Sequence, residues 1–231
     1  WQGGVAVLFV VFAFRVLPKI VLNTPAKGSV NLHASLLPKY RGAAPIHWAV
    51  MNGETTTGCS VFFLDERVDT GAVIRQKEIA IGPNDTTGDV YNRLKEIGAA
   101  VLTEAVGSIE ENSYSTTIQD DAKATPAPKL FTEDCKVDFG KPAGEVHNKI
   151  RGLSPFPTAW GELNDLKFNM YRSRVGPDID LSPGQLSMEN TDLLVGCGTG
   201  TVILDEVQIE GKRKMSGRDF MNGYSGLGVI H

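Results

Sequence analysis

The sequence predicts an α/β domain followed by a smaller domain built mostly of short β-strands. Three observations predict this order. A continuous apolar segment at 5–14 is typical of a strand buried on both faces of a sheet. A long amphipathic pattern at 88–109 predicts a helix. Beyond residue 130, glycine and proline separate short strand patterns, which is typical of a small β-barrel.

Apolar spacing and turn residues define the elements of the first domain. Pro45 suits the first turn of a helix, and Asp85-Thr86-Thr87 supplies an N-cap for the long helix. The predicted elements are a strand at 5–14, a short helix at 18–22, a strand at 30–33, a helix at 45–53, strands at 58–64 and 72–81, and a helix at 88–109.

A polar, proline-containing segment separates the two domains. Residues 120–129 read DDAKATPAPK, which has two prolines and no apolar periodicity and so predicts an extended linker. We therefore place the first domain at 1–113, the linker at 114–130 and the second domain at 131–231. The second domain is predicted to contain a helix at 143–150 and strands at 159–163, 166–172, 192–195 and 201–208.

Composition is ordinary for a globular protein, with 42% hydrophobic and 22% charged residues and a net charge of −4. The three cysteines are far apart in the sequence and odd in number, so they predict neither a disulfide framework nor a metal-ligand pair. They fit a reducing, cytoplasmic compartment. The apolar run at 5–14 is too short to span a bilayer and has no basic residues before it. Because the chain opens on a buried type of strand without Met, we expect further residues upstream of Trp1.

The first candidate site lies at the end of the predicted strand at 30–33. Asn31 and His33 are two residues apart, so both side chains leave the same face of the strand. The carboxyl ends of parallel strands are where open α/β sheets bind ligands. An amide, an imidazole and the downstream carboxylate of Asp69 could stabilise an oxyanion and move a proton. Two plainer interpretations stay open, namely a structural histidine and an ordinary Asp-Thr-Gly turn.

Other classes of site have little support in the sequence. His47, His147 and His231 share no metal-ligand spacing with one another or with a cysteine, so we predict no metal. The sequence has no glycine-rich phosphate loop. The basic cluster at 212–214 could be a solvated turn or a phosphate contact.

Residues 31–54, NLHASLLPKYRGAAPIHWAVMNGE, followed by VDTG at 68–71, resemble the signature of the folate-dependent formyltransferases. The resemblance implies a catalytic trio of Asn31, His33 and Asp69. It implies a 10-formyltetrahydrofolate pocket to which Ser35, Leu36, Leu37 and Pro38 contribute. It also implies the C-terminal part of a Rossmann-like formyltransferase domain, followed by an OB-like barrel.

The resemblance narrows at 41–46, 128–130 and 150–160, which are similar to the methionyl-tRNA formyltransferase family. It implies transfer of a formyl group to the amine of initiator methionyl-tRNA by a monomeric enzyme that uses no metal. Residues 131–231 hold 11 basic and 14 acidic residues, so tRNA binding would come from a local patch. The candidates are Arg41, Lys123, Lys129, Lys149, Arg151, Lys212, Arg213 and Lys214.

Two alternatives remain at this point. A UDP-amino-sugar formyltransferase shares the Asn-Leu-His-x-Ser-Leu-Leu-Pro pattern and an OB-like domain. A folate- or tRNA-binding module without catalysis is the alternative from another class of protein.

Overall fold

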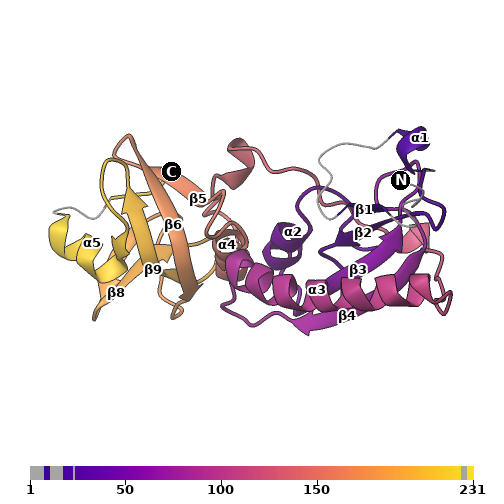
Figure 1. Cartoon of the computed structure of the whole chain (residues 1–231). Helices are drawn as coiled ribbons and strands as arrows, with labels where there is room; N and C mark the ends of the chain where they lie inside the picture. The colour runs from indigo at the N-terminus through magenta and orange to yellow at the C-terminus, as the bar shows by residue number, and fades with distance from the viewer. Residues whose placement is uncertain (1–7, 11–17, 23, 225–227) are drawn as a thin grey trace. The chain divides into compact units, whose positions relative to one another are not determined.

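The computed structural model describes residues 8–10, 18–22, 24–224 and 228–231 (Figure 1). The chain forms two compact units. The first unit contains residues 1–48, 55–81 and 90–129, and the second contains 49–54, 82–89 and 130–231. The segment at 114–129 belongs to the first unit, where Thr117 pairs with Val73 and Pro126 with Arg41.

The first unit contains a four-stranded sheet in the order β1-β2-β3-β4. The strands are β1 (Leu8–Val10), β2 (Ser29–His33), β3 (Thr56–Phe63) and β4 (Val73–Ala80). Strands β1 and β2 run parallel, whereas β2–β3 and β3–β4 are antiparallel. The predicted α/β class is confirmed, with a sheet that is mixed in direction. The β3–β4 pair is antiparallel because the connection at 64–72 is too short for the crossover that parallel neighbours need. Most of the strand predicted at 5–14 lies outside the described residues.

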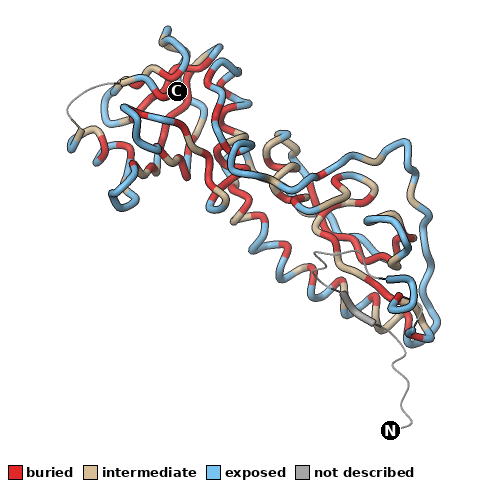
Figure 2. The backbone as a smooth tube through the Cα atoms, turned by 90° about the horizontal axis from the view of Figure 1, so that it is seen from above, coloured by how far each residue is buried: buried red, intermediate tan, exposed pale blue. Residues whose placement is uncertain are grey.

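The α-helices that accompany this sheet in the described part of the chain are α1 (Lys19–Leu22), α2 (Pro45–Met51) and α3 (Thr87–Glu110), and a short 3-10 helix follows at Asp121–Lys123. The predicted N-cap of α3 is confirmed by reciprocal bonds between Thr86 and Asp89. The Asp89 carboxylate accepts from the Thr86 N–H at 2.9 Å, and the Asp89 N–H donates to the Thr86 hydroxyl at 3.1 Å. Buried and exposed positions alternate along α3, as an amphipathic helix requires (Figure 2).

Helix α3 runs along one face of the sheet, which leaves the other face for the candidate site (Figure 1). Gly98 of α3 lies against Leu32 of β2, where an added Cβ would be 3.0 Å from the leucine side chain. Successive side chains of a strand point to opposite faces. Asn31 and His33 therefore point to the face opposite α3, together with their cross-strand neighbours Phe62 and Ser60.

The second unit is built on an antiparallel sheet in the order β5-β6-β9-β8-β7, with β10 paired to β9. Strands β7 and β10 and helix α5 are absent from the sequence prediction, because these short polar segments carry little periodicity. The elements are α4 (Ala143–Gly152), β5 (Ala159–Leu163), β6 (Leu166–Val175), β7 (Leu186–Glu189), β8 (Asp192–Gly196), β9 (Thr201–Ile209), β10 (Met215–Ser216) and α5 (Gly217–Gly223).

The last residues of the chain connect the two outer strands of this open sheet. His231 exchanges two backbone hydrogen bonds of 2.8 Å with Glu162 of β5. Ile230 donates to Gly184 at 2.8 Å, and Val229 forms a bridge with Gln185 just before β7. The sheet encloses a core that includes Ile150, Phe168, Met170 and Leu204, all with no solvent exposure.

His147 of α4 is buried in this unit and bonded at both ring nitrogens. Its Nδ1 lies 2.9 Å from the Ser173 hydroxyl and its Nε2 lies 2.9 Å from the Pro83 carbonyl oxygen. Burial lowers the pKa of His147 below its ordinary value of 6.5, because the charged ring would lose its hydration.

We predict that His147 makes the stability of this protein fall in mild acid. With the folded pKa lowered, the unfolded chain binds more protons as the pH drops below about 6.5, so the free energy of unfolding decreases. His147→Gln should flatten this part of the pH dependence, measured by urea unfolding between pH 5 and pH 7.5. His231→Gln, at an exposed position, is the control. An unchanged profile for His147→Gln would contradict the prediction.

Candidate functional site

The structure brings together the three side chains predicted to be catalytic. His33 ends β2, and its Nδ1 lies 3.7 Å from Oδ2 of Asp69 in the loop between β3 and β4. Both side chains are largely shielded, with 7% and 12% of their surfaces exposed. Asn31 precedes His33 by two residues on the same face of β2. At 3.7 Å the two atoms are near enough for a proton or a small polar group to lie between them.

The hydrogen bond at the other nitrogen of His33 selects which nitrogen faces the site. Nε2 lies 2.7 Å from the carbonyl oxygen of Tyr40, and a carbonyl can only accept, so Nε2 carries a proton. In the neutral ring, Nδ1 then presents a lone pair toward Asp69. A proton placed between them, or the N–H of a bound amine, would bridge two acceptors.

Asp69 is fixed by the loop that carries it. The backbone of Asp69 is left-handed, with φ of 55°, and its Oδ2 accepts the Gly42 N–H at 2.8 Å. Gly71 follows at a point of close backbone approach, where an added Cβ would lie 1.6 Å from the Phe63 carbonyl oxygen. Asp65 closes the loop by accepting from the Thr70 hydroxyl at 2.7 Å. The Asp-Thr-Gly motif therefore needs its glycine for space, and its aspartate carries the carboxylate that faces His33.

Asn31 has an unsatisfied polar atom. Its Oδ1 is shielded from solvent and has no hydrogen-bond partner among the described residues. A buried polar atom without a partner is costly, and such atoms are rare in folded proteins. The orphan atom belongs to the same face of β2 as His33, and it fits a site in which a bound molecule completes the hydrogen bonding.

Ser60 anchors the Ser-Leu-Leu-Pro segment to the site face of the sheet. Its hydroxyl donates to the Ser35 carbonyl oxygen at 2.6 Å and accepts the Leu37 N–H at 3.0 Å. The amide of Gln76 donates to the same hydroxyl at 2.8 Å and to the Leu37 carbonyl oxygen at 2.9 Å. Residues of β3 and β4 therefore hold the backbone of this loop. The Ser-Leu-Leu-Pro motif does not indicate Ser60 or Gln76 as partners, because both lie far from it in the sequence.

The four residues proposed for the folate pocket are closely built into this loop. Ser35 is fully buried, and its hydroxyl donates to the Lys39 carbonyl oxygen at 2.6 Å. Leu37 packs with Phe62 and Val73, and its bond to Pro38 is cis. Leu36 lies against Gly58, where an added Cβ would be 2.5 Å from its side chain. Their contact with a folate stays a prediction.

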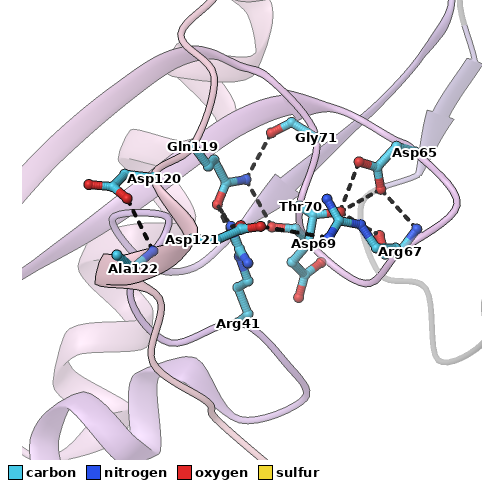
Figure 3. A network of polar contacts seen from close by, with 10 residues as sticks. All are labelled: Arg41, Asp65, Arg67, Asp69, Thr70, Gly71, Gln119, Asp120, Asp121 and Ala122. Atoms are coloured by element: carbon cyan, nitrogen blue, oxygen red, sulfur yellow. Dashed lines mark hydrogen bonds and ion pairs between the residues drawn. The ribbon is translucent and has the colours of Figure 1, made fainter.

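Arg41, a predicted tRNA contact, is engaged within the first unit. Its guanidinium donates to Oε1 of Gln119 from Nε at 3.1 Å and from Nη2 at 2.8 Å. Nη2 also reaches the Asp121 carboxylate at 2.8 Å (Figure 3). This ion pair lowers the pKa of the Asp121 carboxyl below its ordinary value. Only 15% of the Arg41 side chain is exposed.

The other basic candidates occupy separate elements. In the first unit, Lys123 pairs with Asp120 at 3.3 Å and is 76% exposed, and Lys129 is exposed. In the second unit, Lys212 and Arg213 are exposed in the turn after β9, and Lys214 lies over the Tyr171 ring.

Lys149 and Arg151 lie on α4, and burial lowers the pKa of each below its ordinary value. Lys149 donates to the Asp134 carbonyl oxygen. Arg151 is 4% exposed and lines a cavity of about 90 Å³ with Arg172 and Arg174, which the sequence analysis did not single out.

Two family models match the chain. "Formyl transferase" covers residues 2–106, and "Formyl transferase, C-terminal domain" covers residues 129–225. HypX from Aquifex aeolicus, solved in complex with tetrahydrofolic acid, aligns with a TM-score of 0.72 at 19% identity, over 96% of this chain and 39% of that one. The N-formyltransferase from Helicobacter canadensis, in complex with folinic acid and dTDP-3-aminofucose, aligns with a TM-score of 0.68 at 22% identity, over 85% and 72%. The chain thus contains the two domains that these formyl transferase models describe, at residues 2–106 and 129–225.

Two curated relatives indicate which family of formyl transferases the chain belongs to. The methionyl-tRNA formyltransferase of Flavobacterium johnsoniae is 41% identical over 222 residues, which are 94% of this chain and 70% of that protein. The enzyme of the same name from Koribacter versatilis is 41% identical over 211 residues, which are 91% and 67%. The chain belongs to the methionyl-tRNA formyltransferase family.

Two further findings concern the described residues alone. None of their helices combines the length and the apolar character that crossing a membrane requires. They also contain no group of three or more histidine, cysteine, aspartate or glutamate side chains that could hold a metal ion.

We predict that Ser60→Ala loosens the 35–38 loop without unfolding the sheet. The change leaves the Leu37 N–H and the Ser35 carbonyl without their partner, which costs on the order of 1–3 kcal/mol in the free energy of unfolding. Chemical denaturation measures the loss, and Ser113→Ala at an exposed position is the control. If both variants unfold at the wild-type denaturant concentration, Ser60 does not anchor the loop.

Proposed function

We propose that this protein transfers a formyl group from 10-formyltetrahydrofolate to the amine of methionine on initiator tRNA. The observation that carries the proposal is the convergence of Asn31, His33 and Asp69 on one shielded face of the sheet. Membership of the methionyl-tRNA formyltransferase family supports the choice of reaction. In this assignment the folate supplies an activated formyl carbon.

In this proposal Asn31, His33 and Asp69 each have a separate role in the reaction. The Asn31 amide donates to the formyl oxygen, where negative charge develops as the amine attacks. Protonated Nδ1 of His33 is the second donor, because Nε2 is occupied by Tyr40. Preorganised donors of this kind lower the barrier in a site that excludes water. Asp69 holds the imidazole and accepts the amine proton, directly or through water. The tetrahedral intermediate then collapses: the bond between the formyl carbon and the folate nitrogen breaks, that nitrogen takes up a proton, and tetrahydrofolate leaves.

The loop at 35–38 forms one wall of the proposed folate pocket, with Ser35, Leu36, Leu37 and Pro38 as its residues. The support is its place beside His33 and its rigid anchoring through Ser60 and Gln76. The orphan oxygen of Asn31 fits a pocket whose hydrogen bonding is completed by a bound molecule.

We also propose that the first domain is Rossmann-like and that the second is an OB-like barrel. The bonds that link residues 228–231 to both outer strands of the second sheet favour the barrel.

The tRNA is assigned to basic side chains outside this pocket. Lys123, Lys129, Lys212 and Arg213 are exposed basic side chains of the kind that contact phosphates, and Arg151 lines a cavity beside two further arginines. We further propose that the enzyme acts as a monomer in the reducing cytoplasm. Its three cysteines are all buried and free, which fits that compartment.

We predict that His33→Ala and Asp69→Ala each lower the rate of formyl transfer on the order of 100- to 1000-fold while the protein stays folded. Each variant removes a group from the reacting face without emptying a hydrophobic core. Single-turnover formylation measures the rate, and circular dichroism checks the fold. Near-wild-type rates in either variant would remove that residue from the mechanism. His231→Ala and Asp178→Ala, at exposed positions, are the controls.

The acceptor is tested with the natural full-length protein and a 10-formyltetrahydrofolate donor. Methionyl initiator tRNA and a UDP-amino-sugar are offered in competition. We expect formyl-methionyl-tRNA as the main product. Formylation of the sugar alone would replace the proposed acceptor, and folate or tRNA binding without any product would indicate a binding module.

A further inference from the structure

We propose that Gln119 is a positioning residue for the transfer reaction, because it clamps the loop that presents Asp69. The inference rests on the proposed function, in which Asp69 faces the reacting amine. We name the Gln119 carboxamide, the carbonyls of Asp69 and Gly71 and the guanidinium of Arg41 the Gln119 clamp (Figure 3).

The carboxamide of Gln119 uses every hydrogen-bonding group it has. Its Nε2 donates to the Asp69 carbonyl oxygen at 2.9 Å and to the Gly71 carbonyl oxygen at 2.8 Å. Its Oε1 accepts both bonds from Arg41, at 3.1 and 2.8 Å. A primary amide offers two donors and two lone pairs, so all four are satisfied. A fully satisfied network of this kind is rigid and specific.

The loop needs such a clamp because Asp69 is held in an uncommon conformation. A non-glycine residue at φ of 55° costs on the order of 1 kcal/mol or more, and it persists only where the surroundings fix it. The two carbonyls bonded by Gln119 flank Thr70 and define the direction of the backbone on both sides of this tip.

Arg41 couples the clamp to the carboxylate itself. The Gly42 N–H, one residue after Arg41, donates to Oδ2 of Asp69 at 2.8 Å. The turn at 41–42 therefore holds the side chain of Asp69, while Gln119 holds its backbone. The same turn is fastened to residues after Gln119, since Arg41 donates to the Thr125 carbonyl oxygen at 2.9 Å and its carbonyl accepts from Ala127 at 2.7 Å.

This arrangement gives Arg41 a role within the protein. Asp121 neutralises its charge at 2.8 Å, and Asp121 also pairs with Arg67 at 3.6 Å. A guanidinium that is 15% exposed and bonded to an amide and a carboxylate serves as a fixed strut. The segment at 119–127 thus acts on the site through Arg41 and the Asp69 loop.

The test compares Gln119→Ala and Gln119→Glu in the natural full-length protein. Glutamate keeps acceptors for Arg41 but removes the two N–H groups that hold the Asp69 loop. We expect both variants to lower kcat by about 10- to 100-fold, as loss of an orienting partner does, with KM for tRNA and folate near wild type. Gln185→Ala, which removes a side-chain bond to a backbone N–H in the second unit, is the matched control.

A double-mutant cycle separates positioning from general destabilisation. If Gln119 acts through Asp69, adding Gln119→Ala to Asp69→Asn costs no further rate. An equal loss in both backgrounds would overturn the proposal. Wild-type kcat in both Gln119 variants would also overturn it. So would a loss confined to KM for tRNA, which would indicate that Arg41 and its partner Gln119 serve tRNA binding.

The rate of hydrogen exchange at the backbone amides of residues 65–71 measures how firmly the Gln119 clamp holds the Asp69 loop, and it needs no assay of activity. Exchange should be faster in both Gln119 variants than in wild type, and unchanged exchange overturns the proposal. If the wild-type protein formylates no tRNA, the proposed function fails while this measurement still decides whether the clamp exists.

Discussion

One carboxylate oxygen, Oδ2 of Asp69, is where the parts of the candidate site meet. It lies 3.7 Å from the imidazole of His33 and accepts the Gly42 N–H at 2.8 Å. The site therefore depends on the relative positions of three segments: the strand that ends at His33, the turn at Gly42 and the loop that carries Asp69. The carboxylate is 12% exposed, so its place is fixed by these protein contacts rather than by solvent.

Asp69 and residues 35–38 lie in loops, but the strands of the sheet determine where those loops lie. Ser60 of β3 is opposite His33 in the sheet, and its hydroxyl fixes the backbone of the 35–38 loop. Gly71 allows the Asp69 loop to touch the backbone of β3 at Phe63. Both loops thus take their positions from the same strand. This arrangement gives flexible segments the precision that acid–base chemistry and oxyanion stabilisation require.

The sequence predicted the regular elements well where periodicity is strong. The helix at 45–53, the long helix at 88–109 and the strands around 58–64 and 201–208 are confirmed at α2, α3, β3 and β9. The antiparallel direction of β2 beside β3 was not predictable, because the connection at 34–55 is long enough for either direction and a buried strand has the same apolar pattern beside parallel and antiparallel neighbours. The short elements β7, β10 and α5 carried too little pattern to be seen.

By itself, the sequence determined the chemical groups of the site and the face on which two of them lie. Asn31 and His33 share a face because side chains alternate along a strand, and that relation is local. Only the tertiary structure decided that Asp69 approaches His33, that Tyr40 occupies Nε2, and that Gln119 joins Arg41 to the Asp69 loop. Most of these contacts join residues far apart in the chain, and their geometry depends on how the loops pack against the sheet. No spacing rule within the sequence contains that information.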